Sequence, residues 1–239
     1  MLVNPKQPNC RYPYKKLCGA AVAWKVVCLL YRLYAIEEEA EQFLQFVGFA
    51  TVGDVMELDG ENRILVKEGL NQLRITQNYG WRALIQANNL DFDTLNSYHI
   101  GFVLGPCINA SGRLDTAKRS LRLLLAKDAA EAELLATRLK QLNDERKELT
   151  QAAVDLACEQ IDGSTEANDR VLVVYLPDCH ESIAGIVAGR IRERYGKPTF
   201  VVTNAEAEDE AKGSGRSIEA YSMFEEMVKC QDLFRKFGG

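Results

Sequence analysis

Histidine is scarce in this sequence, and the usual cysteine motifs are missing from it. Only two histidines occur among the 239 residues, His99 and His180, which excludes a histidine-rich metal centre built from this chain alone. The seven cysteines are an odd number and form no Cys-x-x-Cys pair, so neither a disulfide framework nor a structural zinc site is indicated. Scattered cysteines of this kind are typical of a reducing compartment, and we expect a cytoplasmic protein.

Long apolar runs and a strong charge imbalance are also absent. The longest apolar stretch, 18–31, is interrupted by Lys25 and is too short to span a bilayer; with no signal peptide evident, we expect no membrane association. The net charge is −5, so any phosphate site must be a local basic patch. The length allows one large or two small domains with a buried core.

Apolar periodicity predicts a helical first half after an extended, proline-punctuated segment at 1–16. The stretch 17–34 is apolar nearly all round, which predicts a buried helix. The pair Asp59-Gly60 predicts a turn, and 100–104 predicts a short strand or a buried turn. Further helices are predicted over 37–52, 62–73 and 80–87.

Glycine and proline are absent from 116–161, where leucines alternate with charged residues. The pattern predicts one long helix, or two helices broken near Asp128. At full extension, about 45 helical residues would reach roughly 65–70 Å, which exceeds an ordinary globular helix. We therefore expect a helical connector between two lobes over 116–165.

The remainder predicts an α/β module, so the expected fold class is α/β, with two lobes joined by the long helical connector. The predicted elements are a strand at 170–176, a helix at 183–195, a strand at 199–203, an acidic turn at 204–210 and a helix at 221–228.

The segment Lys212-Gly-Ser-Gly-Arg-Ser-Ile218 is the most distinctive in the chain. Its glycines allow a positive φ and a close backbone approach to a ligand, and Arg216 can grip a phosphate with a fork of donors. We therefore predict an anion cradle on a loop. His180 lies at a predicted strand-to-helix turn, where it can donate to a phosphate or leaving group; alternatively, it is a surface histidine at a helix start.

Two other segments offer candidate ligands. The small-residue stretch 105–113 is predicted to be a loop, with Arg113 as a phosphate clamp and Asn109 and Ser111 as polar contacts; alternatively, it is a turn with a surface arginine. Asp54 ends an apolar run and could offer a carboxylate oxygen to Mn²⁺ or Mg²⁺; alternatively, it only caps or turns the chain.

Taken together, these segments resemble the DHH phosphoesterase family, specifically its RecJ-like single-stranded-DNA-specific exonucleases. The resemblance runs in order along nearly the whole chain. The matching segments are Asn4–Lys6, Tyr12–Lys15, Leu17–Ala20, Ala50–Asp54, Leu58–Arg63, Gly101–Pro106, Ile108–Leu114, His180–Arg190 and Lys212–Ile218.

The resemblance implies three parts: the C-terminal part of a DHH domain at 1–115, the connector at 116–165, and a truncated DHH-associated domain at 166–239. It implies that Asp54 is a catalytic metal ligand in a site for two Mn²⁺ or Mg²⁺ ions. It also implies that His180 is catalytic and contacts phosphate. The other substrate contacts implied are Asn109, Ser111, Arg113, Gly213, Ser214, Gly215, Arg216 and Ser217.

The chain departs from the family at both ends. The family's acidic pair, lone aspartate and Asp-His-His triplet have no counterpart, and Gly238-Gly239 resembles the start of its Gly-Gly-His motif. We therefore expect an internal fragment that hydrolyses little or nothing alone.

For the parent protein, the resemblance implies a metal-dependent 5′-to-3′ exonuclease on single-stranded DNA in repair and recombination, with single-strand-binding protein or helicase partners. A phosphodiesterase for cyclic dinucleotides or short oligonucleotides is an alternative, although those smaller enzymes have a short linker between lobes. A non-catalytic single-strand-binding remnant is another.

Overall fold

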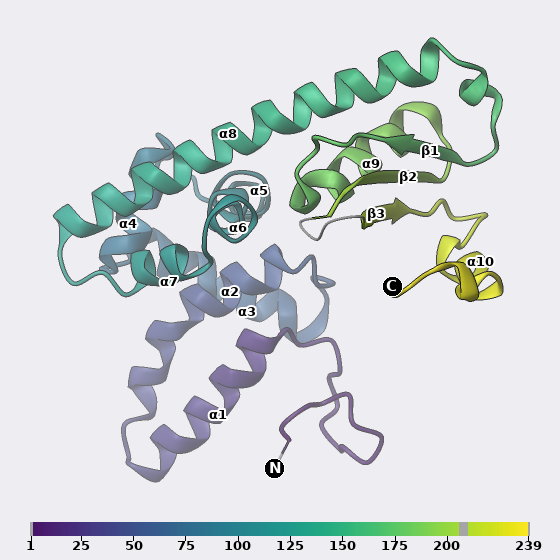
Figure 1. Ribbon diagram of the computed structural model, residues 1–239. Helices are drawn as coiled ribbons and strands as arrows, with labels where there is room; N and C mark the ends of the chain where they lie inside the picture. The colour runs from purple at the N-terminus through teal and green to yellow at the C-terminus, as the bar shows by residue number, and fades with distance from the viewer. Residues whose placement is uncertain (1, 206–209, 239) are drawn as a thin grey trace. The chain divides into compact units, whose positions relative to one another are not determined.

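The computed structural model describes residues 2–205 and 210–238, and it combines many helices with one small sheet (Figure 1). The chain divides into two compact units, Met1–Asn143 and Asp144–Gly239. Among the described residues the sheet lies entirely in the second unit, and the first is helical. The predicted combination of helices and strands is therefore confirmed.

Helices make up the first unit. Its elements are α1 (Gly19–Leu33), the 3₁₀-helix η1 (Glu37–Phe43), α2 (Leu44–Gly53), α3 (Gly60–Arg74), α4 (Tyr79–Ala87), α5 (Ser97–His99), the π-helix η2 (Ile100–Leu104), α6 (Gly105–Leu114), α7 (Lys118–Leu124) and the first part of α8 (Ala129–Asp162). The helices predicted over 62–73 and 80–87 are confirmed as α3 and α4, whereas the one predicted over 37–52 is split into η1 and α2.

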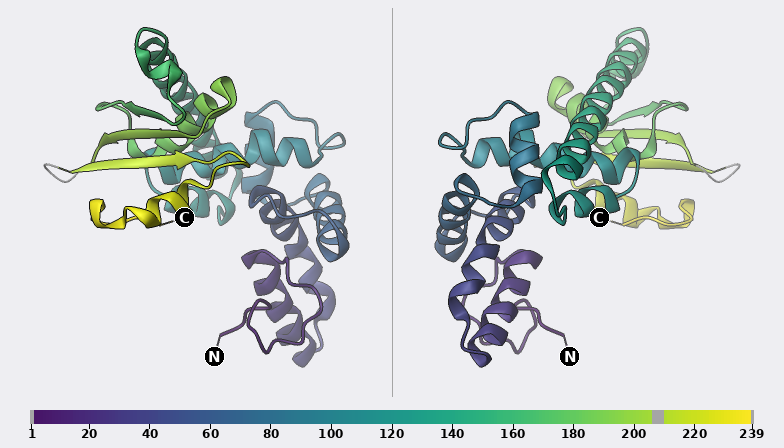
Figure 2. Two further views of the ribbon diagram at one scale, coloured as in Figure 1. Left: turned by 90° about the vertical axis from the view of Figure 1, so that its right-hand side faces the viewer. Right: turned by 90° about the vertical axis from the view of Figure 1, so that its left-hand side faces the viewer.

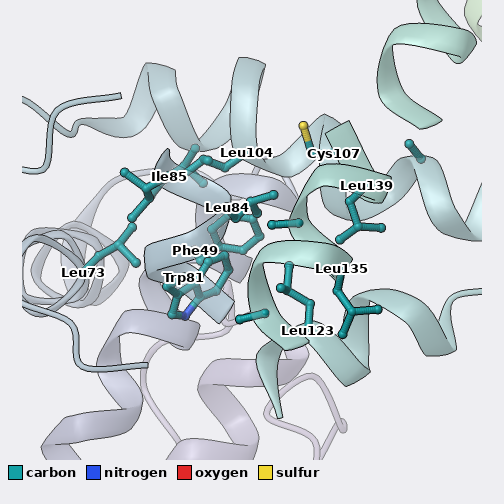
Figure 3. Packing of buried hydrophobic residues seen from close by; sticks show 14 of the residues in the cluster. Phe49, Leu73, Trp81, Leu84, Ile85, Leu104, Cys107, Leu123, Leu135 and Leu139 are labelled. Carbon is teal, nitrogen blue, oxygen red and sulfur yellow. The ribbon is translucent and has the colours of Figure 1, made fainter. Parts of the chain in front are cut away.

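The main core of the first unit gathers around Trp81 (Figure 3). The rings of Trp81 and Phe49 pack with their centroids 4.5 Å apart, and Leu84, Leu123 and Leu139 are fully buried around them. Leu139 belongs to α8, so the first part of that helix completes this core.

The prediction that the first helix is buried is wrong. Ala21 is the buried residue of α1, whereas Leu29, Leu30 and Leu33 are 61%, 48% and 79% exposed. The reason is that α1 contacts α2 and η1 at one end of the first unit, away from α4 and α7 (Figure 2), and two helices cannot cover a helix that is apolar all round.

The segment 100–104 is neither a strand nor a turn, because one helical run continues from α5 through η2 into α6. It begins at Asn96, whose side chain accepts hydrogen bonds from the N–H groups of Tyr98 and His99. Pro106 lies in the first turn of α6, where its missing N–H is tolerated, and α6 directly follows the π-turn at 100–104.

The helical prediction for 116–161 is confirmed in its two-helix form. Helices α7 and α8 are separated by residues 125–128, and Asp128 Oδ1 accepts a hydrogen bond from the N–H of Glu131 at 2.8 Å, which caps α8. The 34 residues of α8 reach about 50 Å. The boundary between the two units falls inside this helix, between Asn143 and Asp144.

The second unit contains a three-stranded sheet in the order β1-β2-β3. Strand β1 pairs with β2 in parallel, and β2 pairs with β3 antiparallel. The strands and helices predicted after 170 are confirmed, but residues 206–209 of the predicted acidic turn lie outside the described residues. The elements are η3 (Thr165–Asn168), β1 (Leu172–Tyr175), α9 (Glu181–Tyr195), β2 (Thr199–Asn204), β3 (Ala211–Arg216), α10 (Met223–Lys229) and η4 (Gln231–Leu233).

One face of the sheet is covered and the other is partly open. Helix α9 packs against β2 and β3, and the last part of α8 joins the same core through Val154, Ala157 and Ile161. On the opposite face Val173 and Tyr175 are 55% and 51% exposed. No helix in the described part of the chain is both long enough and apolar enough to cross a membrane.

Candidate nucleic-acid interface

His180 is the N-cap residue of α9, at the turn between β1 and the helix that the sequence predicts. Its Nδ1 accepts a hydrogen bond from the N–H of Ser182 at 3.2 Å and lies 2.7 Å from Ser182 Oγ. Because Nδ1 is the acceptor, the neutral ring carries its proton on Nε2. The exposed imidazole therefore both starts the helix and retains a donor, so the two roles left open by the sequence are compatible.

The loop that carries His180 is fixed to the sheet. The single hydroxyl hydrogen of Thr203 in β2 is shared between the carbonyl of Cys179 and that of Pro177, which lies 3.3 Å away. Burial raises the pKa of the Cys179 thiol, which lowers the fraction of reactive thiolate. A cavity of about 380 Å³ lies beside the loop, lined mainly by apolar side chains of α8 such as Leu149 and Leu156.

The segment Gly213–Arg216 is an edge strand, not the predicted loop. It belongs to β3 (Ala211–Arg216), and within the described ranges the glycines with positive φ are Gly60 and Gly196, so Gly213 and Gly215 do not use that freedom. Gly215 instead makes room for a ring, because a Cβ there would lie 2.7 Å from Cε1 of Phe200. The backbone of this segment pairs with β2, which limits the N–H groups it can offer to an anion.

The backbone of Arg216 lies at the opposite end of the sheet from His180. It pairs with Thr199 at the start of β2, whereas His180 follows the other end of the parallel strand β1. The two residues therefore extend from opposite ends of the sheet. The side chain folds back along its own strand: Nη1 donates a hydrogen bond to the carbonyl of Gly215 at 2.7 Å, and the guanidinium lies over Gly185 of α9.

Lys212 joins the same side of the sheet. It alternates with Ser214 and Arg216 along β3, so all three side chains point toward α9. Lys212 Nζ lies 2.9 Å from Glu181 Oε2 in the first turn of α9, and Glu181 and Gly185 are one turn, about 6 Å, apart. We call this surface the β3–α9 face. It comprises His180, Glu181, Gly185, Lys212, Ser214 and Arg216.

Ser217 directly follows β3 and connects it to α9 and α10. Its Oγ accepts a hydrogen bond from the N–H of Met223 at 3.1 Å, and its carbonyl accepts one from Arg192 Nη1 at 3.4 Å. The hydroxyl keeps its own hydrogen for a further donation.

The second predicted anion loop, 105–113, is the helix α6. Proline fits the first helical turn, and burial of Cys107 and Ala110 compensates for the weak helix propensity of the small residues. Ser111 is fully buried with its Oγ 2.7 Å from Ser120 Oγ, so its hydroxyl serves packing and does not face a ligand. Asn109 and Arg113 are exposed one turn apart on the helix.

Asp54 is the C-cap residue of α2, and its N–H donates to the carbonyl of Ala50 at 2.8 Å. The carboxylates that follow it in the chain are engaged: Lys16 pairs with both Glu57 and Asp59. A hydrogen bond from Tyr14, followed by one from Lys16, holds the pKa of Asp59 below its usual range. Over residues 2–205 and 210–238, no group of three or more histidines, cysteines or carboxylates could hold a metal ion, so these residues do not fit a two-ion centre by themselves.

Known proteins similar to this chain agree on one family. Residues 168–239 match the DHHA1 domain family. The chain is 34% identical over 238 residues to the single-stranded-DNA-specific exonuclease RecJ of Bacillus subtilis, a match that covers 100% of this chain and 30% of that protein. The chain belongs to the RecJ-like family.

Solved RecJ structures have the same fold as this RecJ-like chain. Crystalline RecJ from Thermus thermophilus, in complex with Mg²⁺, has a TM-score of 0.83 at 31% identity, covering 96% of this chain and 35% of that one. Exonuclease RecJ bound to manganese has a TM-score of 0.82 at 31% identity, covering 97% of this chain and 57% of that one. The chain therefore spans less than two thirds of the relatives it matches, and RecJ-like proteins bind divalent metal ions.

Sequence reasoning from the RecJ-like motifs missed three residues of the β3–α9 face: Glu181, Gly185 and Lys212. Lys212 belongs to the Gly-Ser-Gly-Arg segment but was not predicted as a contact; its place in the alternation of a strand would have revealed it. Gly185 carries no local signal at all, because its role depends on a contact with a residue of another element.

Proposed function

We propose that the β3–α9 face binds the phosphate backbone of single-stranded DNA. The observation that carries this proposal is that Lys212 and the guanidinium of Arg216 lie against the first two turns of α9, the helix whose N-cap residue is His180. Donors of this kind bind phosphate oxygens without reading the bases, so the binding is sequence-independent and sensitive to salt. This site is the local basic patch that a chain of net charge −5 requires.

The whole protein is proposed to be a metal-dependent 5′-to-3′ exonuclease of DNA repair and recombination that acts in the cytoplasm on single-stranded DNA. The similarity to RecJ proteins supports this proposal, and so does the length of α8, since small-substrate phosphodiesterases of the superfamily have a short linker. We propose that residues 1–115 are part of a DHH domain, 116–165 the connector and 166–239 a DHH-associated domain. For the whole protein we propose single-strand-binding protein or helicase partners.

The candidate residues of the first unit differ in the roles that we propose for them. Asn109 and Arg113 keep their proposed contacts to phosphate, whereas the buried Ser111 does not. Asp54 would supply one carboxylate to Mn²⁺ or Mg²⁺, but the residues that the structure describes do not complete a two-ion centre. We expect no steady turnover when this chain is incubated with Mn²⁺ and labelled single-stranded DNA; turnover lost on Asp54→Ala would contradict that expectation.

Binding of a labelled oligothymidylate over a salt series tests the β3–α9 face. Arg216→Ala should weaken binding roughly tenfold, because one charge-assisted contact is lost, and should reduce the salt slope by about one. Arg194→Ala is the matched control: it removes the same charge from the last turn of α9, about 13 Å along the helix from Gly185. Equal binding by the Arg216→Ala variant and the parent chain would refute the proposal.

A further inference from the structure

Gly185 lies in the second turn of α9, directly under the guanidinium of Arg216. A Cβ at this position would lie 2.5 Å from Arg216 Nη2, 3.3 Å from its Cζ and 3.4 Å from Ser214 Oγ. Real Cβ contacts essentially never fall below 3.0 Å. The guanidinium therefore occupies the space that any side chain at 185 would need.

The position of Arg216 in the sheet explains why this space matters. Its backbone is at the end of the sheet away from His180, so an extended side chain would carry the positive charge away from the other two donors. Only by folding back over α9 does the guanidinium reach the level of Ser214, next to the turn that Lys212 contacts.

We propose that Gly185 is a positioning residue for phosphate binding: its missing side chain keeps open the place where the Arg216 guanidinium joins Lys212 and His180. This inference rests on the proposed function of the β3–α9 face. It adds a specific role for a glycine inside a helix.

If Gly185 were needed for packing instead, Gly185→Ala would lower the thermal unfolding midpoint. The three atoms nearest to its added Cβ are side-chain atoms, and the closest is the far end of a flexible arginine, which can swing away. Alanine also favours the helix over glycine. Gly185→Ala should therefore leave the thermal unfolding midpoint unchanged or slightly raised while it displaces the guanidinium.

The same helix offers a matched control. Gly189 lies one turn further along α9 and has no other atom within 4 Å of its added Cβ. Gly185→Ala should weaken oligothymidylate binding roughly tenfold and reduce the salt slope by about one, as Arg216→Ala does, whereas Gly189→Ala should bind as the parent chain does. Equal binding by the Gly185→Ala and Gly189→Ala variants, or a lowered unfolding midpoint for Gly185→Ala, would overturn the inference.

Combining the variants separates positioning from a general loss of structure. In the Arg216→Ala background, adding Gly185→Ala should change binding no further, because the group that Gly185 accommodates is already gone. A second, additive loss would show that Gly185 acts by another route.

A measurement without DNA keeps the two proposals distinguishable. The Nε–Hε signal of Arg216 in a ¹H–¹⁵N spectrum, assigned by its loss in Arg216→Ala, should shift in Gly185→Ala and stay in place in Gly189→Ala. An unmoved signal in Gly185→Ala refutes the positioning role whatever the binding data are. If the signal moves but the parent chain and Arg216→Ala bind DNA equally, the proposed function of the face fails instead.

Discussion

The tripeptide Ser-Gly-Arg occurs twice in this chain, at 111–113 and at 214–216, with opposite structural outcomes. The first copy is helical and lies in α6; the second is extended and lies in the edge strand β3. In the first copy the serine is buried and the glycine is exposed. In the second copy the glycine packs against an aromatic ring and the arginine folds onto a helix.

The comparison shows that the same three residues have different structural roles, because they contact different residues in the two copies. In α6 the Ser111 hydroxyl is hydrogen-bonded to that of Ser120, so stability depends on the serine of this copy. In β3 the close contact of Gly215 with Phe200 means that structure depends on the glycine. Matched substitutions in the two copies should therefore give unequal effects, and the following four range from the largest to the smallest.

Gly215→Ala should be the most damaging of these changes. The new Cβ would lie 2.7 Å from Phe200 Cε1 and 3.3 Å from Met223 Cε, and overpacking of this kind costs about 1–3 kcal/mol. Urea unfolding followed by a probe in the second unit measures the loss. A change below about 0.5 kcal/mol would show that Phe200 moves aside freely and would remove the contrast with the first copy.

Ser111→Ala should lower the free energy of unfolding by about 1 kcal/mol. The variant loses a buried hydrogen bond with Ser120, but Ser120 keeps its own bond to the carbonyl of Ile108 at 2.7 Å, so no buried hydroxyl is left without a partner. The same urea titration, followed in the first unit, checks this value. Unchanged stability would indicate that the pair contributes nothing.

Gly112→Ala should stabilise the first unit by about 0.5–1 kcal/mol, because alanine favours a helix and the glycine is exposed. The nearest atom to its added Cβ is Ala117 Cβ at 3.7 Å, an ordinary contact. This is the same substitution as in the second copy with the opposite sign. A rise in the thermal midpoint confirms it, and a fall would mean that α6 needs the glycine for another reason.

Ser214→Ala should have the smallest effect, within about 0.5 kcal/mol of the parent stability. Ser214 is half-buried at the edge strand, whereas the matching Ser111 is fully buried. Thermal unfolding of both alanine variants side by side gives the comparison. A larger loss of stability for Ser214→Ala than for Ser111→Ala would contradict the view that the serine matters more in the first copy.

Periodicity and capping made much of the fold predictable from the sequence. Helices α3, α4 and α9 follow clear apolar spacing, and strands β1 and β2 are apolar runs bounded by turn residues. Segments rich in small residues were not predictable. Local composition indicates a loop for both 105–113 and 211–216, but burial of Cys107 and Ala110 in one case and pairing with β2 in the other decides the structure.

The candidate site was predictable to a similar degree. His180 could be placed at a helix start because both flanking elements have strong patterns. The direction of the Arg216 side chain could not be predicted, since it depends on the antiparallel pairing of β3 and on the absence of a side chain at Gly185.

Helix α8 belongs to the cores of both units, with Leu135 and Leu139 packed in the first and Val154 and Ile161 in the second. Starting a helix is unfavourable, while extending one costs little. Whichever unit orders its share of α8 first has therefore already nucleated the helix for the other. We therefore expect the folding of the two units to be coupled through α8. A break in the helix between residues 143 and 150 should make folding less favourable for both.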